Sequence, residues 1–242
     1  LQAFFMGASD FTYTDTWHGI TSSSALIGCI LGSAISGLCA SRLGRKKSLF
    51  LAGVLFFLSA LGSYYPEFLF FGYGEPSYSL LLAFNFYRVL GGVGVGLASA
   101  ICPMYIAEIA PSNIRGTLVS WNQFAIIFGQ LVVYFVNFLI LGDNINPVIR
   151  AVEGVNQIQN PDAAAWTIET GWRLMFVSEA VPAGLFTLLV LLVPETPRYL
   201  ALCGRDDKAL AVLGRINGAS QARAILADIK ATAHEKTERL FT

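Results

Sequence analysis

Long apolar runs are the feature that most constrains this chain. The hydrocarbon core of a bilayer is about 30 Å thick, so one spanning helix needs roughly 20 mostly apolar residues. Five runs of this kind are present, at residues 20–41, 48–65, 80–107, 117–142 and 172–193. A buried helix in a soluble core can produce one such run, but five of them in 242 residues predict an all-α bundle of membrane-spanning helices.

Composition supports a membrane protein and excludes several other classes. Hydrophobic residues make up 55% of the chain and charged residues 13%, whereas about a quarter of a soluble domain is charged. The net charge is zero, with no basic patch that would indicate a nucleic-acid partner. The four cysteines lack metal-ligand spacing, and the two histidines, His18 and His234, lie outside the apolar runs. We therefore expect no enzyme activity, no cofactor and no metal site.

Loop charges give the chain an orientation. The loops after the first, third and fifth runs carry the basic residues Arg42, Arg45, Lys46, Lys47, Arg115, Arg198 and Arg205. The other loops are acidic, with one basic residue, Arg150. The positive-inside rule places the basic loops in the cytoplasm, so the chain begins outside and ends inside. A carrier half with both ends inside has six spans, and we therefore expect one further helix before Leu1.

Two stretches lie outside the apolar runs. Residues 143–170, rich in Asn and Gln, are expected to form an irregular outer loop. Residues 203–242 are charged and carry an apolar stripe at helical spacing, formed by Ala222, Ile225, Leu226, Ile229 and Ala233. We expect residues 1–202 to form a partial N-terminal transmembrane bundle and residues 203–242 a cytoplasmic helical linker. The stripe is expected to dock on this chain more readily than on a separate partner.

Small residues line one face of two spans. Ser24, Gly28, Gly32, Ser36 and Ala40 recur every four residues in the first span. The third span repeats this spacing with Gly92, Gly96 and Ala100. Because lipid provides no hydrophobic force between helices, small faces that permit close backbone approach take that role. These faces are predicted to be helix–helix contacts.

Two charged residues lie well inside the spans, away from their ends: Arg88 in the third and Glu179 in the fifth. Such a group is costly at membrane depth and is therefore a candidate functional site. Each lies roughly 10 to 12 Å from the outer end of its helix, at 1.5 Å per residue, so the two are expected to share a layer. They could form a structural ion pair, or they could tune the proton affinity of a carboxylate on the expected further helix.

The fourth span contains amides among its apolar residues. Gln123 and Gln130 are two turns apart and share one face, with Ile126 between them. Neutral amides both donate and accept hydrogen bonds, which suits sugar hydroxyl groups. Hydrogen bonding between helices is the alternative use, and the two residues alone do not decide between them.

Several motifs together are typical of a known family. Residues 90–96, followed by Tyr105, Glu108 and Arg115, resemble its second signature. Arg88 precedes the glycine pair Gly91-Gly92 in an R-x-x-G-G arrangement, and residues 194–198 resemble its P-E-S-P-R motif. Residues 37–47 resemble its first-loop motif, with Ser41 at the acidic position. Residues 122–130 are very similar to a fourth-span motif. The chain is identified as a member of the sugar porters of the major facilitator superfamily, and it resembles bacterial D-xylose–proton symporters.

This resemblance implies a function. It implies a twelve-helix carrier in the cell membrane, of which this chain covers part of the N-terminal half. Such a carrier moves a monosaccharide, such as D-xylose, together with a proton by alternating access. The sugar site would include Gln123, Ile126 and Gln130, and Arg88 and Glu179 would act in proton coupling. A cytoplasmic charge network that holds the outward-open state would contain Arg45, Glu108, Arg115, Glu195 and Arg198. The resemblance places the proton-coupling aspartate on the first helix, and the second wall of the sugar site in the C-terminal half. A membrane sugar sensor that binds without transport is the alternative.

Overall fold

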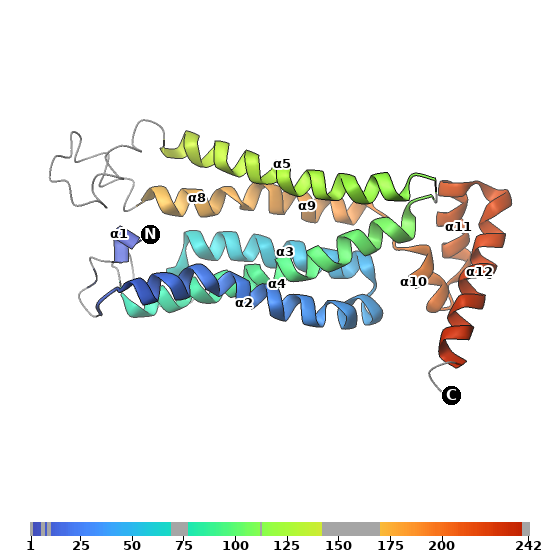
Figure 1. Ribbon diagram of the computed structural model, residues 1–242, viewed down its shortest axis with the longest axis horizontal. Helices are drawn as coiled ribbons and strands as arrows, with labels where there is room; N and C mark the ends of the chain where they lie inside the picture. Colours follow the sequence, from blue (N-terminus) through green and yellow to red (C-terminus); the bar gives the residue numbers. More distant parts are fainter. Residues whose placement is uncertain are drawn as a thin grey trace.

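A computed structural model describes residues 2–5, 8, 11–68, 77–111, 113–141 and 170–238, which form helices and no strand. The elements are α1 (Gln2–Phe5), α2 (Asp15–Arg42), α3 (Arg45–Tyr64), the 3-10 helix η1 (Pro66–Phe68), α4 (Tyr78–Ile109), α5 (Arg115–Leu141), α8 (Trp172–Ser178), α9 (Ala180–Leu192), α10 (Pro197–Leu202), α11 (Asp206–Asn217) and α12 (Ala219–Glu238). The long helices lie side by side, and α10–α12 gather at one end of the bundle (Figure 1).

The five predicted spans are confirmed. Five helical stretches in the described residues are long and apolar enough to cross a membrane: α2, α3, α4, α5 and the pair α8–α9. The largest boundary difference is at α2, which begins at Asp15 rather than near residue 20. The predicted outer loop lies outside the described residues, apart from its last residue, Thr170.

The fifth span is two helices rather than one. Helix α8 ends at Ser178, α9 begins at Ala180, and Glu179 occupies the turn between them. Pro182 explains the break, because it has no N–H to donate to the carbonyl oxygen of Ser178, four residues earlier. The interruption therefore coincides with the ionisable residue of this span.

Helix α4 packs against both α2 and α3, and α3 also packs against α9. The predicted small faces form the α2–α4 contact. A Cβ atom added to Gly28 would lie 2.2 Å from the carbonyl oxygen of Val89, and one added to Gly92 would lie 2.1 Å from that of Ala25. Only glycine permits so close a backbone approach. The prediction that these faces are helix contacts is confirmed.

Helix α5 is less embedded. It contacts α4 and α8 at few places, and none of its membrane-spanning residues is buried. Many of its apolar side chains, including Phe128 and Leu131, are more than half exposed. In this chain α5 therefore presents most of its circumference to its surroundings.

The last three helices form a separate apolar cluster. Ala222 and Leu226 of α12 are buried against Leu213 of α11, and Ile225 and Ile229 pack at the edge. This confirms that the predicted stripe docks within the chain, although the side chain of Ala233 lies outside the described part. The cluster lies beside the end of the bundle where α2 ends and α3 begins (Figure 1).

Candidate functional site

A cavity at membrane depth contains both ionisable residues predicted from the spans. It has a volume of about 330 Å³ and opens between α2, α3, α4 and α9. Arg88 and Glu179 are the two charged residues of its described lining, and Ser59 adds a hydroxyl group. The remaining lining is glycine, proline and apolar side chains. The expectation that the two residues share a layer is therefore met.

Arg88 and Glu179 do not form an ion pair. Within the described residues, the guanidinium of Arg88 makes no hydrogen bond and no contact within ion-pair distance of a carboxylate. Instead its Cζ atom lies 5.2 Å from the centre of the Phe176 ring. Glu179 is exposed toward the cavity, within electrostatic reach of Arg88. A permanent structural ion pair, one of the two alternatives left open by the sequence, is absent from this structure.

The predicted sugar-contacting residues lie on α5. Gln123, Ile126 and Gln130 share one face of this helix, and all three are exposed. Among the described residues no group hydrogen-bonds to the side-chain amide of either glutamine. Their amides are therefore not used to hold α5 against its neighbours, so both retain their full capacity to donate and accept.

At the end of the bundle that the loop charges predict to be cytoplasmic, three of the five predicted network residues come together. The Nη2 atom of Arg45 lies 2.7 Å from Oε1 of Glu108, and both side chains are about nine-tenths buried. Arg45 also donates to the carbonyl oxygen of Ala40 at 3.2 Å. Its guanidinium lies 5.7 Å from the ring centre of Tyr199. This cation therefore joins the ends of α2, α3 and α4 to α10.

Glu195 is the third member and acts as a cap. Its carboxylate accepts hydrogen bonds from the backbone N–H groups of Arg45 (3.0 Å), Lys46 (3.1 Å) and Thr196 (3.0 Å). A carboxylate at a helix N-terminus satisfies free N–H groups and interacts favourably with the helix dipole. Glu195 thus caps α3 from a position 150 residues further along the chain.

Arg115 and Arg198 lie outside this cluster. Arg115 donates to the carbonyl oxygen of Ala110, at 3.5 Å, and no carboxylate pairs with it in the described residues. Arg198 is exposed and makes no hydrogen bond to any described residue. Ser41, which stands where the motif has an acid, bonds to the carbonyl oxygen of Leu38, within its own helix. The observed network is therefore smaller than the family motif implies.

Two tyrosines join helices at the same end. Tyr105 was named from the sequence only as part of the second signature, with no role assigned, and Tyr199 was not named. Tyr105 donates to the carbonyl oxygen of Pro194 at 2.7 Å, and Tyr199 donates to that of Arg42 at 3.0 Å. A hydrogen bond with the Cys203 thiol, burial and the nearby Glu195 raise the pKa of Tyr199, so its hydroxyl group stays a protonated donor. Tyr105 lies in the second signature, and Tyr199 follows the end-of-half motif.

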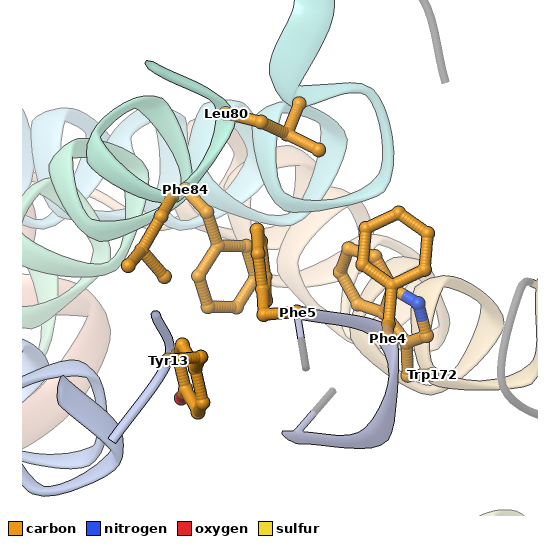
Figure 2. Close-up of a cluster of buried hydrophobic side chains, with 7 residues drawn as sticks. Phe4, Phe5, Tyr13, Leu80, Phe84 and Trp172 are labelled. Atoms are coloured by element: carbon orange, nitrogen blue, oxygen red, sulfur yellow. The ribbon is translucent and has the colours of Figure 1, made fainter. Parts of the chain in front are cut away.

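An ion pair at the opposite end of the bundle was also missed. Arg173, at the start of α8, donates to both carboxylate oxygens of Glu67, at 2.7 and 3.2 Å, and to the carbonyl oxygen of Tyr64 at 3.1 Å. Its guanidinium also lies over the rings of Phe4 and Trp172, two members of an apolar cluster formed by Phe4, Phe5, Tyr13, Leu80, Leu81, Phe84 and Trp172 (Figure 2). The position of Arg173, one residue into the fifth apolar run, could have indicated this pair, because an arginine in a membrane span needs a partner.

Replacing Gly44 by alanine should disturb the cap that Glu195 makes. Gly44 has φ +91°, and an added Cβ atom would lie 2.5 Å from Oε2 of Glu195. We expect a loss of about 2 kcal/mol in stability, from backbone strain and displacement of the carboxylate. Gly204→Ala is the matched control, because Gly204 has φ +71° and nothing within 4 Å of the added atom. Thermal melting of the two purified variants checks this, and equal losses would show that crowding of Glu195 adds nothing.

Comparisons with known proteins show the family to which this chain belongs. A family model described as "Sugar (and other) transporter" matches residues 2–242. The chain belongs to the sugar transporter family. The resemblance inferred from the motifs is confirmed. Members of this sugar transporter family carry solutes rather than catalyse reactions, and the chain is a multi-pass membrane protein.

Individual relatives of this sugar transporter chain agree. It is 46% identical over 220 residues to the D-xylose-proton symporter of Escherichia coli (strain K12), covering 88% of this chain and 41% of that protein. It is 39% identical over 201 residues to the glucose transport protein of Synechocystis sp., covering 83% and 37%. A structure of the xylose transporter XylE from E. coli, partially occluded and inward open, matches with a TM-score of 0.78 and 43% identity, covering 92% and 49%. The chain thus spans less than half the length of these relatives.

Proposed function

We propose that this chain is the N-terminal part of a carrier that moves a monosaccharide together with a proton across the cell membrane by alternating access. The observation that carries the proposal is the membrane-depth cavity shared by Arg88 and Glu179, in a chain of the sugar transporter family. In a low-dielectric cavity that holds one arginine and one carboxylate, the net charge changes when the carboxylate binds a proton. The D-xylose-proton symporter is among the relatives, and D-xylose is therefore the proposed sugar.

In this proposal the α5 face binds the sugar. Gln123 and Gln130 hydrogen-bond to sugar hydroxyl groups, and Ile126 packs between them against the apolar face of the ring. The exposure of all three residues supports this use, since nothing else in the described chain occupies them. The rest of the carrier, including a first helix and a C-terminal half, supplies the opposite wall. Such carriers place the site near the midplane, between two halves that rock about it.

The cytoplasmic cluster of Arg45, Glu108 and Glu195 has a separate proposed role. It fastens α2, α3, α4 and α10 together at the cytoplasmic end, so that the bundle moves as one body during transport. Arg115 and Arg198, which pair with no carboxylate among the described residues, make ionic contacts in another state of the carrier. Residues 1–202 are the proposed transmembrane part and residues 203–242 the cytoplasmic helical linker.

Sugar counterflow in proteoliposomes tests the sugar site. Purified full-length carrier should exchange labelled D-xylose against a D-xylose load, and Gln130→Ala should weaken the apparent affinity roughly 30-fold, for a loss of about 2 kcal/mol. Gln221→Ala, at an exposed glutamine of α12, is the control and should behave as the wild type.

Each other outcome has a defined meaning. Counterflow that is unchanged by Gln130→Ala would remove this residue from the sugar site. Absence of counterflow with D-xylose and with other pentoses and hexoses would contradict the transport proposal. Saturable sugar binding without any counterflow would favour a membrane sugar sensor instead.

A further inference from the structure

The guanidinium of Arg88 lies on an aromatic face rather than on a carboxylate. Its Cζ atom is 5.2 Å from the ring centre of Phe176, one turn before Glu179 in sequence. No described residue gives this guanidinium a hydrogen bond or an ion pair. An arginine at membrane depth needs compensation, and the negative face of an aromatic ring attracts a cation strongly when both are desolvated. Phe176 is therefore the partner that Arg88 has in this structure.

Phe176 is held in place by its own neighbours. Phe84 of α4 meets it at 5.2 Å between ring centres, with an interplanar angle of 73°. Trp172, one turn earlier on α8, meets it at 6.3 Å and 76°. Phe84 is fully buried and Trp172 is 4% exposed. Edge-to-face packing on two sides fixes the ring plane, and with it the face presented to Arg88.

Trp172, against which Phe176 packs, is held in turn by Arg173, whose partner Glu67 lies in η1, just after the end of α3. The Arg173 guanidinium lies 5.0 Å from the centre of the Trp172 ring and binds Glu67 through two hydrogen bonds. The Phe4 ring lies beside Trp172 (Figure 2), at 5.5 Å between ring centres, and the Arg173 guanidinium also lies 5.7 Å from the Phe4 ring centre. The Glu67 side chain is 3% exposed, so this bidentate pair is shielded from water. The position of Phe176 is thus set by a buried framework and not by the cavity.

We propose that Phe176 is a positioning residue for coupling: its ring holds the Arg88 guanidinium apart from Glu179, so that Arg88 has two alternative partners on adjacent turns of one span. The inference rests on the proposed sugar–proton symport. In the described lining, which comes from α2, α3, α4 and α9, Arg88 and Glu179 are the charged groups, so no other charge there competes for the guanidinium. When Glu179 is ionised, its carboxylate attracts the Arg88 guanidinium away from the ring, and when Glu179 carries the proton, the ring holds the guanidinium instead.

Uptake driven by a proton gradient, compared with counterflow, tests this role in full-length carrier. Counterflow needs no net proton movement, so a residue that acts only in coupling affects it little. Phe176→Leu should lower the ratio of proton-driven uptake to counterflow about tenfold, which is the change expected from the loss of one buried cation–π contact. Phe176→Tyr keeps the aromatic face and should restore the ratio. Phe86→Leu, at an exposed phenylalanine of the same helix as Arg88, should leave it unchanged.

Fluorinated phenylalanines at position 176 provide a second measurement that keeps the side-chain shape and the fold. Each added fluorine weakens the negative ring face, so the ratio should fall stepwise with their number. A ratio insensitive to fluorination, or a Phe176→Leu variant that loses uptake and counterflow equally, would overturn the inference and leave Phe176 as a packing residue. Failure of the proposed function is a different result, since the wild type itself would then show no counterflow.

Discussion

Alanine in place of Gly28 is expected to prevent stable association of α2 with α4. The added Cβ atom would lie 2.2 Å from the carbonyl oxygen of Val89 and 2.9 Å from Cα of Gly92. Both obstacles are backbone atoms, so no side-chain rotation can relieve the contact and the two helices must separate. Overpacking by one methyl group costs typically 1 to 3 kcal/mol, and we expect about 3 kcal/mol here because the whole α2–α4 interface shifts.

Thermal melting and size-exclusion profiles of the detergent-solubilised full-length protein measure this effect. Gly19→Ala is the matched control on the same helix, because nothing lies within 4 Å of its added Cβ atom. Since alanine favours a helix over glycine, that variant should melt at the same temperature or slightly higher. Equal stability of the two variants would mean that α2 and α4 do not pack as closely as the structure shows.

Removal of the Arg45 guanidinium has the second large expected effect. Arg45→Met keeps a long apolar stem but leaves the Glu108 carboxylate, whose side chain is 9% exposed, without its cation. Breaking a buried pair by removing one partner typically costs about 3 to 5 kcal/mol, because the remaining charge is buried and uncompensated. The carbonyl oxygen of Ala40 and the ring of Tyr199 lose a contact as well.

A double substitution separates charge from packing. If the cost comes from the stranded carboxylate, Arg45→Met combined with Glu108→Gln should recover much of the lost melting temperature. Arg215→Met, at an exposed arginine of α11, is the control and should change stability by less than about 0.5 kcal/mol. A double variant that is as unstable as the sum of its parts would show that packing, and not charge, accounts for the loss.

The sequence predicts most of the bundle for identifiable reasons. Span number follows from the length of apolar runs, because no shorter helix crosses the hydrocarbon core. The α2–α4 contact follows from Gly28 and Gly92, since small residues at four-residue spacing have few other uses in lipid. The break at Glu179 could have been predicted from Pro182, whose missing N–H frees a carbonyl oxygen one turn earlier.

Less of the candidate site could be predicted from the sequence alone. Phe176 carries no signal of its own, because one aromatic residue in an apolar run does not indicate a cation partner. The Arg173–Glu67 pair joins positions 106 residues apart, and spacing along the chain does not reveal it. The contact between Arg45 and Glu108 was implied only by family resemblance. The exposure of α5 depends on which helices surround it, which periodicity within one helix does not specify.

Proton movement on addition of sugar tests the central proposal most directly. Full-length carrier is reconstituted into liposomes that contain a pH-sensitive dye, and D-xylose is added outside without an imposed gradient. Symport predicts that the lumen acidifies as sugar enters, and that Gln221→Ala carrier does the same. Entry of D-xylose to equilibrium with no change in luminal pH would contradict the account, because the carrier would then be a facilitator in which Arg88 and Glu179 do not couple a proton to the sugar.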